Sequence, residues 1–363
     1  MPSQLSIIAA SPSVPPPPRL PAAGSDMPAA LRRLLLPERG GAAGAGQLLR
    51  RIVDGRLDRL PPPGGGATAQ RWRALAEVAG HDLSLLKLYE GHTDALAILA
   101  ELGAPAAPGT LWGVWCAEPP DGRVTVHRST SGAVRLSGRK LWCSGAATLD
   151  HALVSCWDEE GLPWLAAVAL DQPGVTVTAG GWHAVGMAGS ASVDVVFDNA
   201  EAQLVGVSGA YVRRPGFWHG GAGIAACWYG AARAIADSLL AAVRAGAARQ
   251  AADPHRLAQL GMADIALAGA AAVLRESAAA IDADPEADAG VLALRARLAV
   301  EAAATLVLQH ATRALGATPL CRDPHFARLA ADLPVFLRQS HAERDLAALG
   351  RMLSESEESP WAL

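Results

Sequence analysis

The sequence predicts an α+β protein in which a helical domain comes first, a central antiparallel β-sandwich or barrel second, and a four-helix bundle last. Apolar residues recur at helical spacing near both ends of the chain, whereas the middle has short β-branched and aromatic runs between turn residues. A length of 363 residues suits two or three packed domains. The predicted units are residues 1–26 (a disordered tail), 27–109, 110–209 and 210–363.

The composition excludes several classes of protein. A net charge of −4 implies no basic face, so we expect no nucleic-acid partner. Five cysteines without a C-x-x-C pair argue against a disulfide framework and a zinc site, and favour a reducing, cytoplasmic setting. The apolar residues 6–10 are too few for a signal peptide, and the uncharged run 220–232 is too short to span a bilayer, so no membrane segment is expected.

The amino-terminal part is predicted to be helical after the tail rich in Pro, Ser and Ala. Residues 27–60 contain two apolar periods separated by a glycine-rich segment, which indicates two helices. A Pro-Pro-Pro-Gly-Gly-Gly break follows at residues 61–66. Residues 69–102 are then expected to form a helix that Gly103 and Pro105 end.

The pattern changes to short strands at Thr110. These runs are bounded by Asp-Gly, Ser-Gly, Glu-Gly and Pro-Gly turns, and strands at such close intervals indicate an antiparallel sandwich or barrel. The expected strands are residues 111–117, 124–127, 134–141, 152–157, 164–170, 175–179 and 193–197.

Long segments rich in Ala and Leu make up the rest of the chain. In the third of them Leu294, Leu298, Ala302 and Leu306 recur every fourth residue, which predicts the buried face of a bundle helix. Because the Ala-rich faces need burial, we expect a homodimer or homotetramer. The predicted helices are residues 219–250, 254–282, 285–315 and 324–353.

Residues 136–150 combine an aromatic side chain, a hydroxyl and a glycine turn. On an extended strand, side chains two residues apart point to the same face, so Trp142 and Ser144 are expected to lie together. That face is suited to stack on a flat ring such as a flavin and to hydrogen-bond its edge. A strand with a core tryptophan and a turn serine explains the same residues.

Several motifs in the right order strengthen the ligand hypothesis. With the succession of helices and strands, they make residues 28–353 resemble the acyl-CoA dehydrogenase family. The matching segments are residues 115–119 (its Thr-Glu-Pro strand end), 136–145 (its L-x-G-x-K-x-W-I-T-N-G segment), 173–175 (its P-G-V), 186–190 (its G-x-R-x-S) and 195–198 (its V-x-F-D).

The resemblance implies a helical domain, a β-domain and a four-helix bundle, with FAD between the last two. It also implies an FAD-dependent oxidoreductase that oxidises an acyl thioester, such as an acyl-CoA, at Cα–Cβ by proton abstraction and hydride transfer to flavin N5. Donors directed at the ring would stabilise the charge that it acquires on reduction. The implied cofactor contacts are Trp115, Cys116, Ala117, Trp142, Cys143 and Ser144.

The chain departs from the family at the catalytic base, which is a glutamate near the end of the bundle or on its first helix. Residues 336–345 have no Tyr-Glu-Gly-Thr segment, and Gly220 stands at the other place. His341 and His219 lie beside these two positions. Because imidazole gains and loses a proton near neutral pH, they are the candidate catalytic residues, with Glu343 as a fallback. A helix-end and a surface histidine are the plainer interpretation.

Two further departures define an alternative. The loop at residues 120–123 is shortened, and the bundle lacks the Arg-x-x-Phe-Gly that lends an arginine to FAD, so FAD is expected to bind less tightly or be replaced by a reduced FMN or FAD that comes and goes. Ser144-Gly145 and His341 also suit flavin-dependent monooxygenases of this fold, which act on small aromatic or sulfur substrates with O2. A family member without catalytic activity is a third hypothesis.

Overall fold

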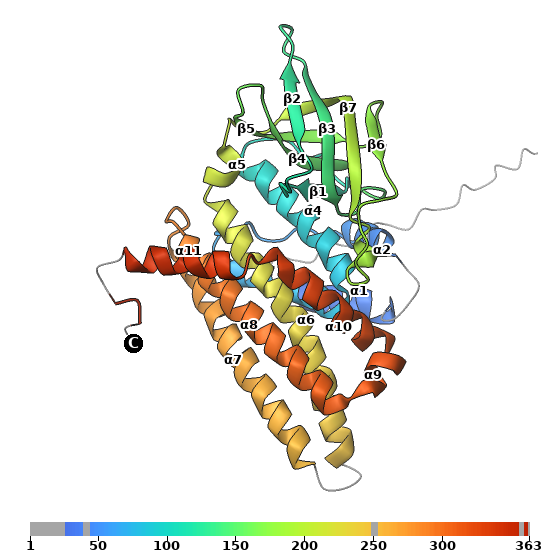
Figure 1. The fold of residues 1–363 in the computed structure, drawn as a ribbon, viewed down its shortest axis with the longest axis vertical. Helices are drawn as coiled ribbons and strands as arrows, with labels where there is room; N and C mark the ends of the chain where they lie inside the picture. Colours follow the sequence, from blue (N-terminus) through green and yellow to red (C-terminus); the bar gives the residue numbers. More distant parts are fainter. Residues whose placement is uncertain (1–25, 39–43, 248–252, 356–358, 362–363) are drawn as a thin grey trace, which may run out of the picture.

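The structure, a computed structural model, describes residues 26–38, 44–247, 253–355 and 359–361. All but Asp26 of the predicted tail lies outside these residues. The described elements follow the order helices, strands, helices. In Figure 1 the strands gather at one end of the long axis, and the long helices α6 (Gly216–Ala247), α7 (Pro254–Ala283) and α8 (Gly290–Leu315) extend towards the other.

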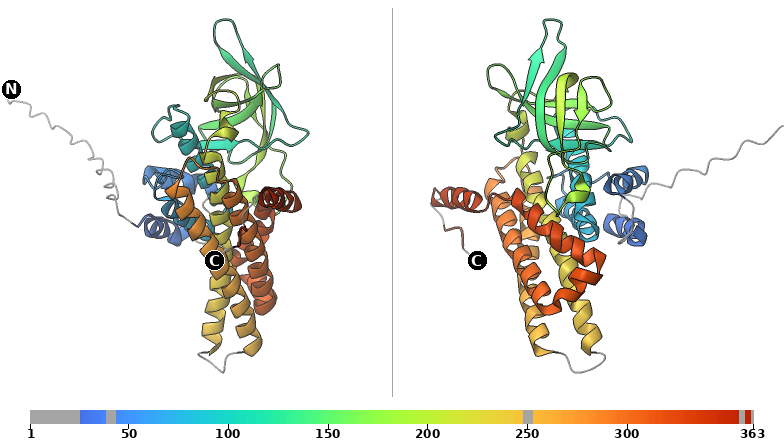
Figure 2. Two further views of the ribbon diagram at one scale, coloured as in Figure 1. Left: turned by 90° about the vertical axis from the view of Figure 1, so that its left-hand side faces the viewer. Right: turned by 45° about the vertical axis from the view of Figure 1, so that its right-hand side comes forward.

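The amino-terminal helices lie beside the junction between strands and bundle (Figure 2). The helix predicted over residues 69–102 is two helices, because the Asp82 backbone is extended and its carboxylate accepts the N–H of Leu85 at 2.8 Å. Such a cap starts a new helix. The elements are α1 (Met27–Leu35), η1 (Leu36–Glu38), α2 (Ala45–Asp54), α3 (Thr68–His81) and α4 (Leu83–Glu101).

The seven predicted strands are confirmed, with shifted ends. Apolar residues of α4, such as Ile98 and Leu99, pack on Trp112, Leu153 and Leu165 of the sheet. The strands are β1 (Trp112–Trp115), β2 (Val124–Arg128), β3 (Val134–Cys143), β4 (His151–Trp157), β5 (Pro163–Ala169), β6 (Val175–Val177) and β7 (Val193–Leu204).

The expectation of a purely antiparallel sheet is wrong at two ladders. Strand β4 pairs in parallel with β1 and with β2, whereas the other pairings are antiparallel. The β2–β3 hairpin lies between β1 and β4 in the chain, and a connection of that length allows parallel neighbours. The order β4-β2-β3-β7-β5 returns to β4, so the sheet closes into a barrel.

The last predicted helix, residues 324–353, is broken. It consists of α10 (Pro324–Phe336), a single 3-10 turn η3 (Leu337–Gln339) and α11 (Glu343–Ser354), and Ala342 between them has a φ of 47°. A residue other than glycine rarely adopts this conformation, so the surrounding contacts must hold it. The remaining short elements are η2 (Ala188–Ser190), α5 (Ala210–Arg213) and α9 (Ala317–Arg322).

The buried face of α8 is not the predicted one. Leu294 is buried, but Ala302 is exposed and Leu306 is 40% exposed. A step of four residues overshoots a helical turn of about 3.6 residues by roughly 40°, so an every-fourth pattern rotates away from the core. The buried residues of α8 are Gly290, Ala293, Leu294, Ala296, Val300, Ala303, Ala304, Val307 and Ala311.

Helix α7 is unusually apolar for its exposure. Among the described residues it is the one helix whose length and composition would allow it to cross a membrane, with a mean hydropathy of 1.7 over a stretch of which 11% is buried. Exposed side chains on it include Leu257, Met262 and Ile265. A core helix of a soluble protein can meet the same criteria, and here α7 packs along α6 and α8. Two expectations from the sequence stay predictions: that the protein has no membrane partner, and that it forms a homodimer or homotetramer.

Helices α3 and α6 approach each other most closely at Gly230. A Cβ atom at this position would lie 2.2 Å from the carbonyl oxygen of Ala76 and 2.6 Å from its Cα atom. These are backbone atoms, which cannot move aside as a side chain can. The contact fixes the helical domain against the bundle, and with it one side of the site described below.

We expect Gly230→Ala to lower the free energy of unfolding by roughly 1–3 kcal/mol, because the added methyl group forces the two helices apart. Urea denaturation measures the change. Gly246→Ala on the same helix is the matched control, since nothing lies within 4 Å of its added Cβ. It should be neutral or slightly stabilising. Equal stabilities for the two variants would contradict the packing described here.

Candidate functional site

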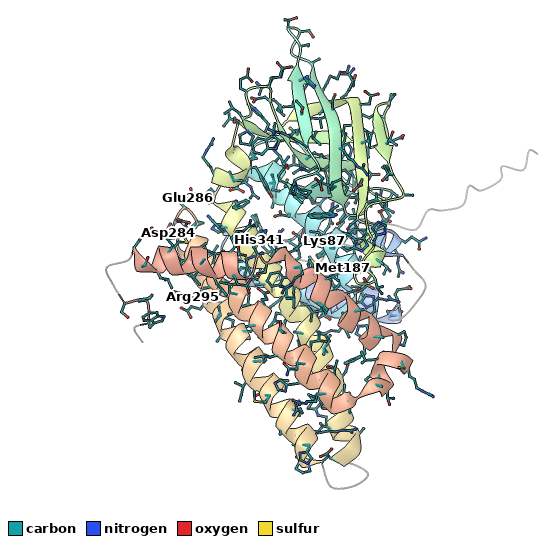
Figure 3. The ribbon with its side chains drawn as sticks, in the orientation of Figure 1. Lys87, Met187, Asp284, Glu286, Arg295 and His341 are labelled. Carbon is teal, nitrogen blue, oxygen red and sulfur yellow. The ribbon has the colours of Figure 1, made fainter. Side chains whose placement is uncertain are left out.

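A cavity of about 720 Å³ lies where the β-barrel, the helical domain and the bundle meet. Figure 3 shows Lys87, Met187 and His341, which line it from three different parts of the chain, at this junction. The volume is in the range of small-molecule and cofactor sites. Its aromatic lining residues are Trp115, Trp142, Trp182, Tyr211, Phe217, Trp218 and Phe336.

Trp142 and Ser144 both line the cavity, but simple strand alternation does not bring them there. Strand β3 has a register shift between Lys140 and Cys143, and the φ of Trp142 is 58°. This local kink turns the indole outwards, so that 49% of Trp142 is exposed and faces the cavity. Cys143 is fully buried, and its thiol donates to the carbonyl of Lys140 at 3.3 Å, so it does not reach the cavity.

A row of hydroxyl groups continues from Ser144 along the cavity wall. Ser144 Oγ lies 2.7 Å from Ser192 Oγ, which lies 2.8 Å from Ser190 Oγ, and Ser190 donates to the carbonyl of Met187 at 2.7 Å. All four residues line the cavity. Sequence reasoning reached Ser190 through its motif but missed Ser192, whose position depends on the turn that follows η2.

The segment Trp115 to Ala117, which the resemblance implies as a cofactor contact, also lines the cavity, and polar contacts fix it. The indole N–H of Trp115 donates to the carbonyl of Ser144 at 3.2 Å. Just beyond, Glu118 accepts from the fully buried Lys140 ammonium at 2.7 Å. Burial raises the pKa of the Cys116 thiol to about 11, so this group stays neutral at working pH.

His341 lines the cavity from the break before α11. Its Nδ1 lies 3.3 Å from Asp345 Oδ1, and its backbone N–H donates to the other oxygen of Asp345 at 3.0 Å. The imidazole is 57% exposed, which gives it access to solvent protons. Glu343, the fallback base, is exposed and is not among the lining residues.

Arg297 of α8 holds this break against α6. Its guanidinium donates to the carbonyl of Gly221 at 3.2 Å and to that of Gln339 at 2.7 Å, and it lies over the ring of Trp228. Burial lowers the pKa of Arg297, with nearby acids opposing the shift. The two carbonyls come from α6 and η3, so one side chain joins three elements around the cavity.

The structure does not bring His219 to the cavity. It is 2% exposed beneath the loop that contains Gly64, where a Cβ atom would come within 2.9 Å of its Nδ1. Its Nε2 has no partner among the described residues, and burial lowers its pKa. Neighbouring residues of a helix point about 100° apart, so Gly220 and Gly221 line the cavity while His219 faces away.

Helix α4 contributes three charged residues that sequence reasoning missed: Lys87, Glu90 and Asp94. Their spacing of three and four residues places them on one face of a helix that is otherwise largely apolar. Charged residues along one face of an otherwise apolar helix can therefore indicate, from the sequence, that this face lines a cavity. Lys87 pairs with Glu90 at 2.8 Å, whereas Asp94 makes no hydrogen bond with the described residues.

Comparisons with known proteins agree with this architecture. No protein-family model matches the chain. The amino sugar nitrososynthase DnmZ of Streptomyces peucetius is 37% identical over 144 residues, which are 34% of this chain and 35% of DnmZ. The match therefore covers about a third of the length of that protein.

Solved structures match nearly the whole chain. TdsC of Paenibacillus sp. A11-2, solved with FMN and indole, has a TM-score of 0.77 at 21% identity, over 92% of this chain and 98% of TdsC. Butyryl-CoA dehydrogenase of Megasphaera elsdenii has a TM-score of 0.76 at 15% identity, over 91% and 98%. The chain has the acyl-CoA dehydrogenase fold. The resemblance inferred from the sequence motifs is thereby confirmed for the fold.

A third structure with this fold is KijD3, solved with FMN and dTDP-3-amino-2,3,6-trideoxy-4-keto-3-methyl-D-glucose. Its TM-score is 0.78 at 20% identity, over 95% of this chain and 96% of KijD3. TdsC is described as a dibenzothiophene monooxygenase. Proteins with the acyl-CoA dehydrogenase fold thus include dehydrogenases, monooxygenases and nitrososynthases.

Asp332 of α10 links the bundle to the cavity wall at Met187. One carboxylate oxygen accepts the N–H of Met187 at 2.6 Å, and the other has no partner among the described residues. Burial raises the pKa of this carboxyl from 3.8 to about 6, and the charge of Asp82 adds to the shift. Asp332 is 4% exposed, so ionising it in the folded state is costly.

We expect the contribution of Asp332 to the stability of the wild-type protein to fall as the pH rises from about 4 to about 6. Between the unfolded pKa of about 4 and the folded pKa of about 6, the folded state binds more protons, so ionisation favours unfolding. Asp332→Asn keeps a carbonyl acceptor for Met187 and cannot ionise. Its free energy of unfolding relative to wild type should rise by on the order of 1–3 kcal/mol from pH 4 to pH 7. Parallel pH profiles from denaturation curves would contradict this.

Proposed function

We propose that this protein is a flavin-dependent monooxygenase, which uses reduced flavin and O2 to oxygenate a small molecule. The observation that carries the proposal is the cavity between the exposed indole of Trp142 and the His341–Asp345 pair. By the resemblance of the sequence to acyl-CoA dehydrogenases, Gly220 stands at one of the two positions where that family carries its glutamate and His341 lies beside the other; both residues line the cavity. The FMN in the structures of TdsC and KijD3 supports the same class.

The residues present fit a flavin. A large flat indole with 49% of its surface exposed inside a cavity is an incomplete apolar contact that a planar ring would complete. The Ser144 hydroxyl and the backbone of residues 115–117 line the same space and supply polar contacts. FMN, or FAD bound less tightly, meets these features, and the chain lacks the arginine motif that the family uses for FAD on a neighbouring subunit.

Each lining group then has a role. Reduced flavin supplies two electrons and, with O2, an electrophilic oxygen atom. Trp142 would hold the ring by stacking on it, and Ser144 would hydrogen-bond its edge. The aromatic side chains of Trp182, Phe217 and Phe336 keep water away from this part of the cavity. Excluding water limits the loss of the activated oxygen to side reactions.

His341 exchanges the protons that oxygen transfer requires. With Nδ1 held towards Asp345, its Nε2 is left to take or give a proton. The exposed imidazole can restore that proton from solvent. Asp345 orients the imidazole ring of His341, as carboxylates commonly orient catalytic histidines.

The sequence-based prediction of acyl-thioester oxidation is the second candidate. The carboxyl group of Asp94 inside the cavity favours it, because a base must remove the α-proton. The likeness to butyryl-CoA dehydrogenase supports it as well. Anaerobic bleaching of the bound flavin by acyl-CoAs separates the two: bleaching favours the dehydrogenase, whereas a flavin that bleaches only with an external reductant favours the monooxygenase.

We expect Trp142→Ala to weaken flavin binding about tenfold or more, because it removes the stacking surface. Anaerobic titration with reduced and oxidised FMN and FAD, followed by absorbance, measures the dissociation constants. Trp361→Ala is the matched control, because Trp361 is 80% exposed and does not line the cavity. If both variants bind flavin as the wild type does, Trp142 is no part of a flavin site.

We expect His341→Ala to lower oxygen transfer by roughly 10²–10⁴-fold while leaving flavin affinity unchanged, because a proton donor and acceptor is lost. The measurement is product formation from a panel of indole, dibenzothiophene and primary amines with reduced FMN and O2, beside the hydrogen peroxide released. Glu343→Gln, an exposed neighbour, should behave as wild type. A loss of activity in that variant, with His341→Ala unaffected, would assign the proton chemistry to Glu343 instead.

A further inference from the structure

Asp94 is the cavity-lining carboxylate for which the described part of the chain offers no hydrogen-bond or ion-pair partner. Of the acids that line the cavity, Glu90 is held by the Lys87 ammonium at 2.8 Å, and Asp345 is held by His341. Asp94 has no hydrogen bond or ion pair within 4 Å among the described residues. A carboxylate in an apolar cavity normally finds donors, so one of its donors is expected to come from a ligand.

Helix α6 leaves room for such a ligand directly opposite Asp94. A methyl group at Gly220 would lie 3.1 Å from Asp94 Oδ1, and nothing lies within 4 Å of the position a Cβ would take at Gly221. Any side chain at Gly220 would therefore cover the carboxylate. The two glycines keep the carboxylate open to the cavity.

Positive charges surround the same carboxylate from other elements. Arg71 of α3 is 5% exposed and donates only to neutral oxygens of Pro61 and Thr93. Arg214 is 7% exposed, pairs with Glu101 and has an Nε without a partner among the described residues. The titratable groups whose charges act on Asp94 or feel its charge are Arg71, Lys87, Glu90, Cys116, Tyr211 and Arg214.

We propose that Asp94 is a catalytic residue that binds the ammonium group of a primary amine substrate and takes its proton. The inference rests on the proposed function, because it names the substrate class of the same cavity. Burial raises the pKa of the Asp94 carboxyl, and the charge of Glu90 adds to the shift. Both effects favour transfer of the proton from nitrogen to Asp94, whereas the cations at Arg214, Arg71 and Lys87 lower the pKa of the carboxyl and oppose the transfer.

The step supplies the form of the amine that can be oxygenated. An ammonium has no lone pair, whereas the neutral amine can attack an electrophilic oxygen. Proton transfer converts R–NH3⁺ and the Asp94 carboxylate into R–NH2 and the carboxylic acid. One oxygen atom of O2 then forms the N–O bond of R–NHOH, and the other leaves as water with two electrons and two protons from reduced flavin.

The test compares two amines of different basicity in the flavin-loaded protein. Benzylamine is protonated at pH 7 and aniline is not. For Asp94→Asn we expect hydroxylamine formation from benzylamine at pH 7 to fall roughly 10²-fold or more, and that from aniline to stay near the wild-type rate. The benzylamine rate of the variant should recover as the pH rises, because solution then supplies the neutral amine.

Asp171→Asn is the matched control. Asp171 is exposed in the turn after β5 and does not line the cavity, so both amines should react as in wild type. Gly220→Ala tests the geometry without removing a charge. The methyl group facing Asp94 should weaken benzylamine binding in calorimetric titrations while flavin binding stays unchanged.

The outcomes separate this inference from the proposed function. If indole or dibenzothiophene is oxygenated and no amine is, or if Asp94→Asn loses both amines equally without recovery at high pH, the role of Asp94 is overturned and the monooxygenase stands. If neither FMN nor FAD binds in either redox state, the proposed function fails. Selective loss of benzylamine oxidation with recovery at high pH supports both.

Discussion

The cavity depends on the Arg297 guanidinium and the carbonyls that it joins. Arg297 is half-buried, and the hydrogen-bond partners of its charge are the carbonyl oxygens of Gly221 and Gln339 rather than a carboxylate. Because one acceptor belongs to α6 and the other to η3, Arg297 sets the separation of the elements that line the cavity from the bundle side. The same side chain holds the broken helix that carries His341, through the carbonyl of Gln339.

Much of the fold followed from local patterns. The seven strands were marked by turn residues and β-branched runs, and the wall that contains Trp142 and Ser144 was found from side-chain types and motif order. The features that failed depend on longer-range contacts. The parallel partners of β4 depend on where the β2–β3 hairpin lies in space, and the break at Ala342 is imposed by packing that no local propensity shows.

The site was predicted less well than the fold, for two physical reasons. A change of one residue along α6 turns His219 from the cavity to the core, so proximity in sequence to Gly220 did not place its side chain. The charges of α4 come from a part of the chain far from the motifs. The fold alone does not decide the chemistry, because dehydrogenases and oxygenases share it. On the proposal made above, this chain differs in that α4 supplies the carboxylate through Asp94.

The row of serine hydroxyls has a polarity. Ser190 donates its proton to the carbonyl of Met187, so in its contact with Ser192 it can only accept. Ser192 therefore donates to Ser190 and accepts from Ser144. One direction satisfies all three contacts. Ser144 therefore turns lone pairs towards the cavity, and a ring edge that carries a hydrogen on nitrogen is matched there, while one that carries a bare nitrogen is not. In the proposed flavin site, the carbonyl of Met187 at the far end of the row would thus set which redox form of the ring the wall prefers.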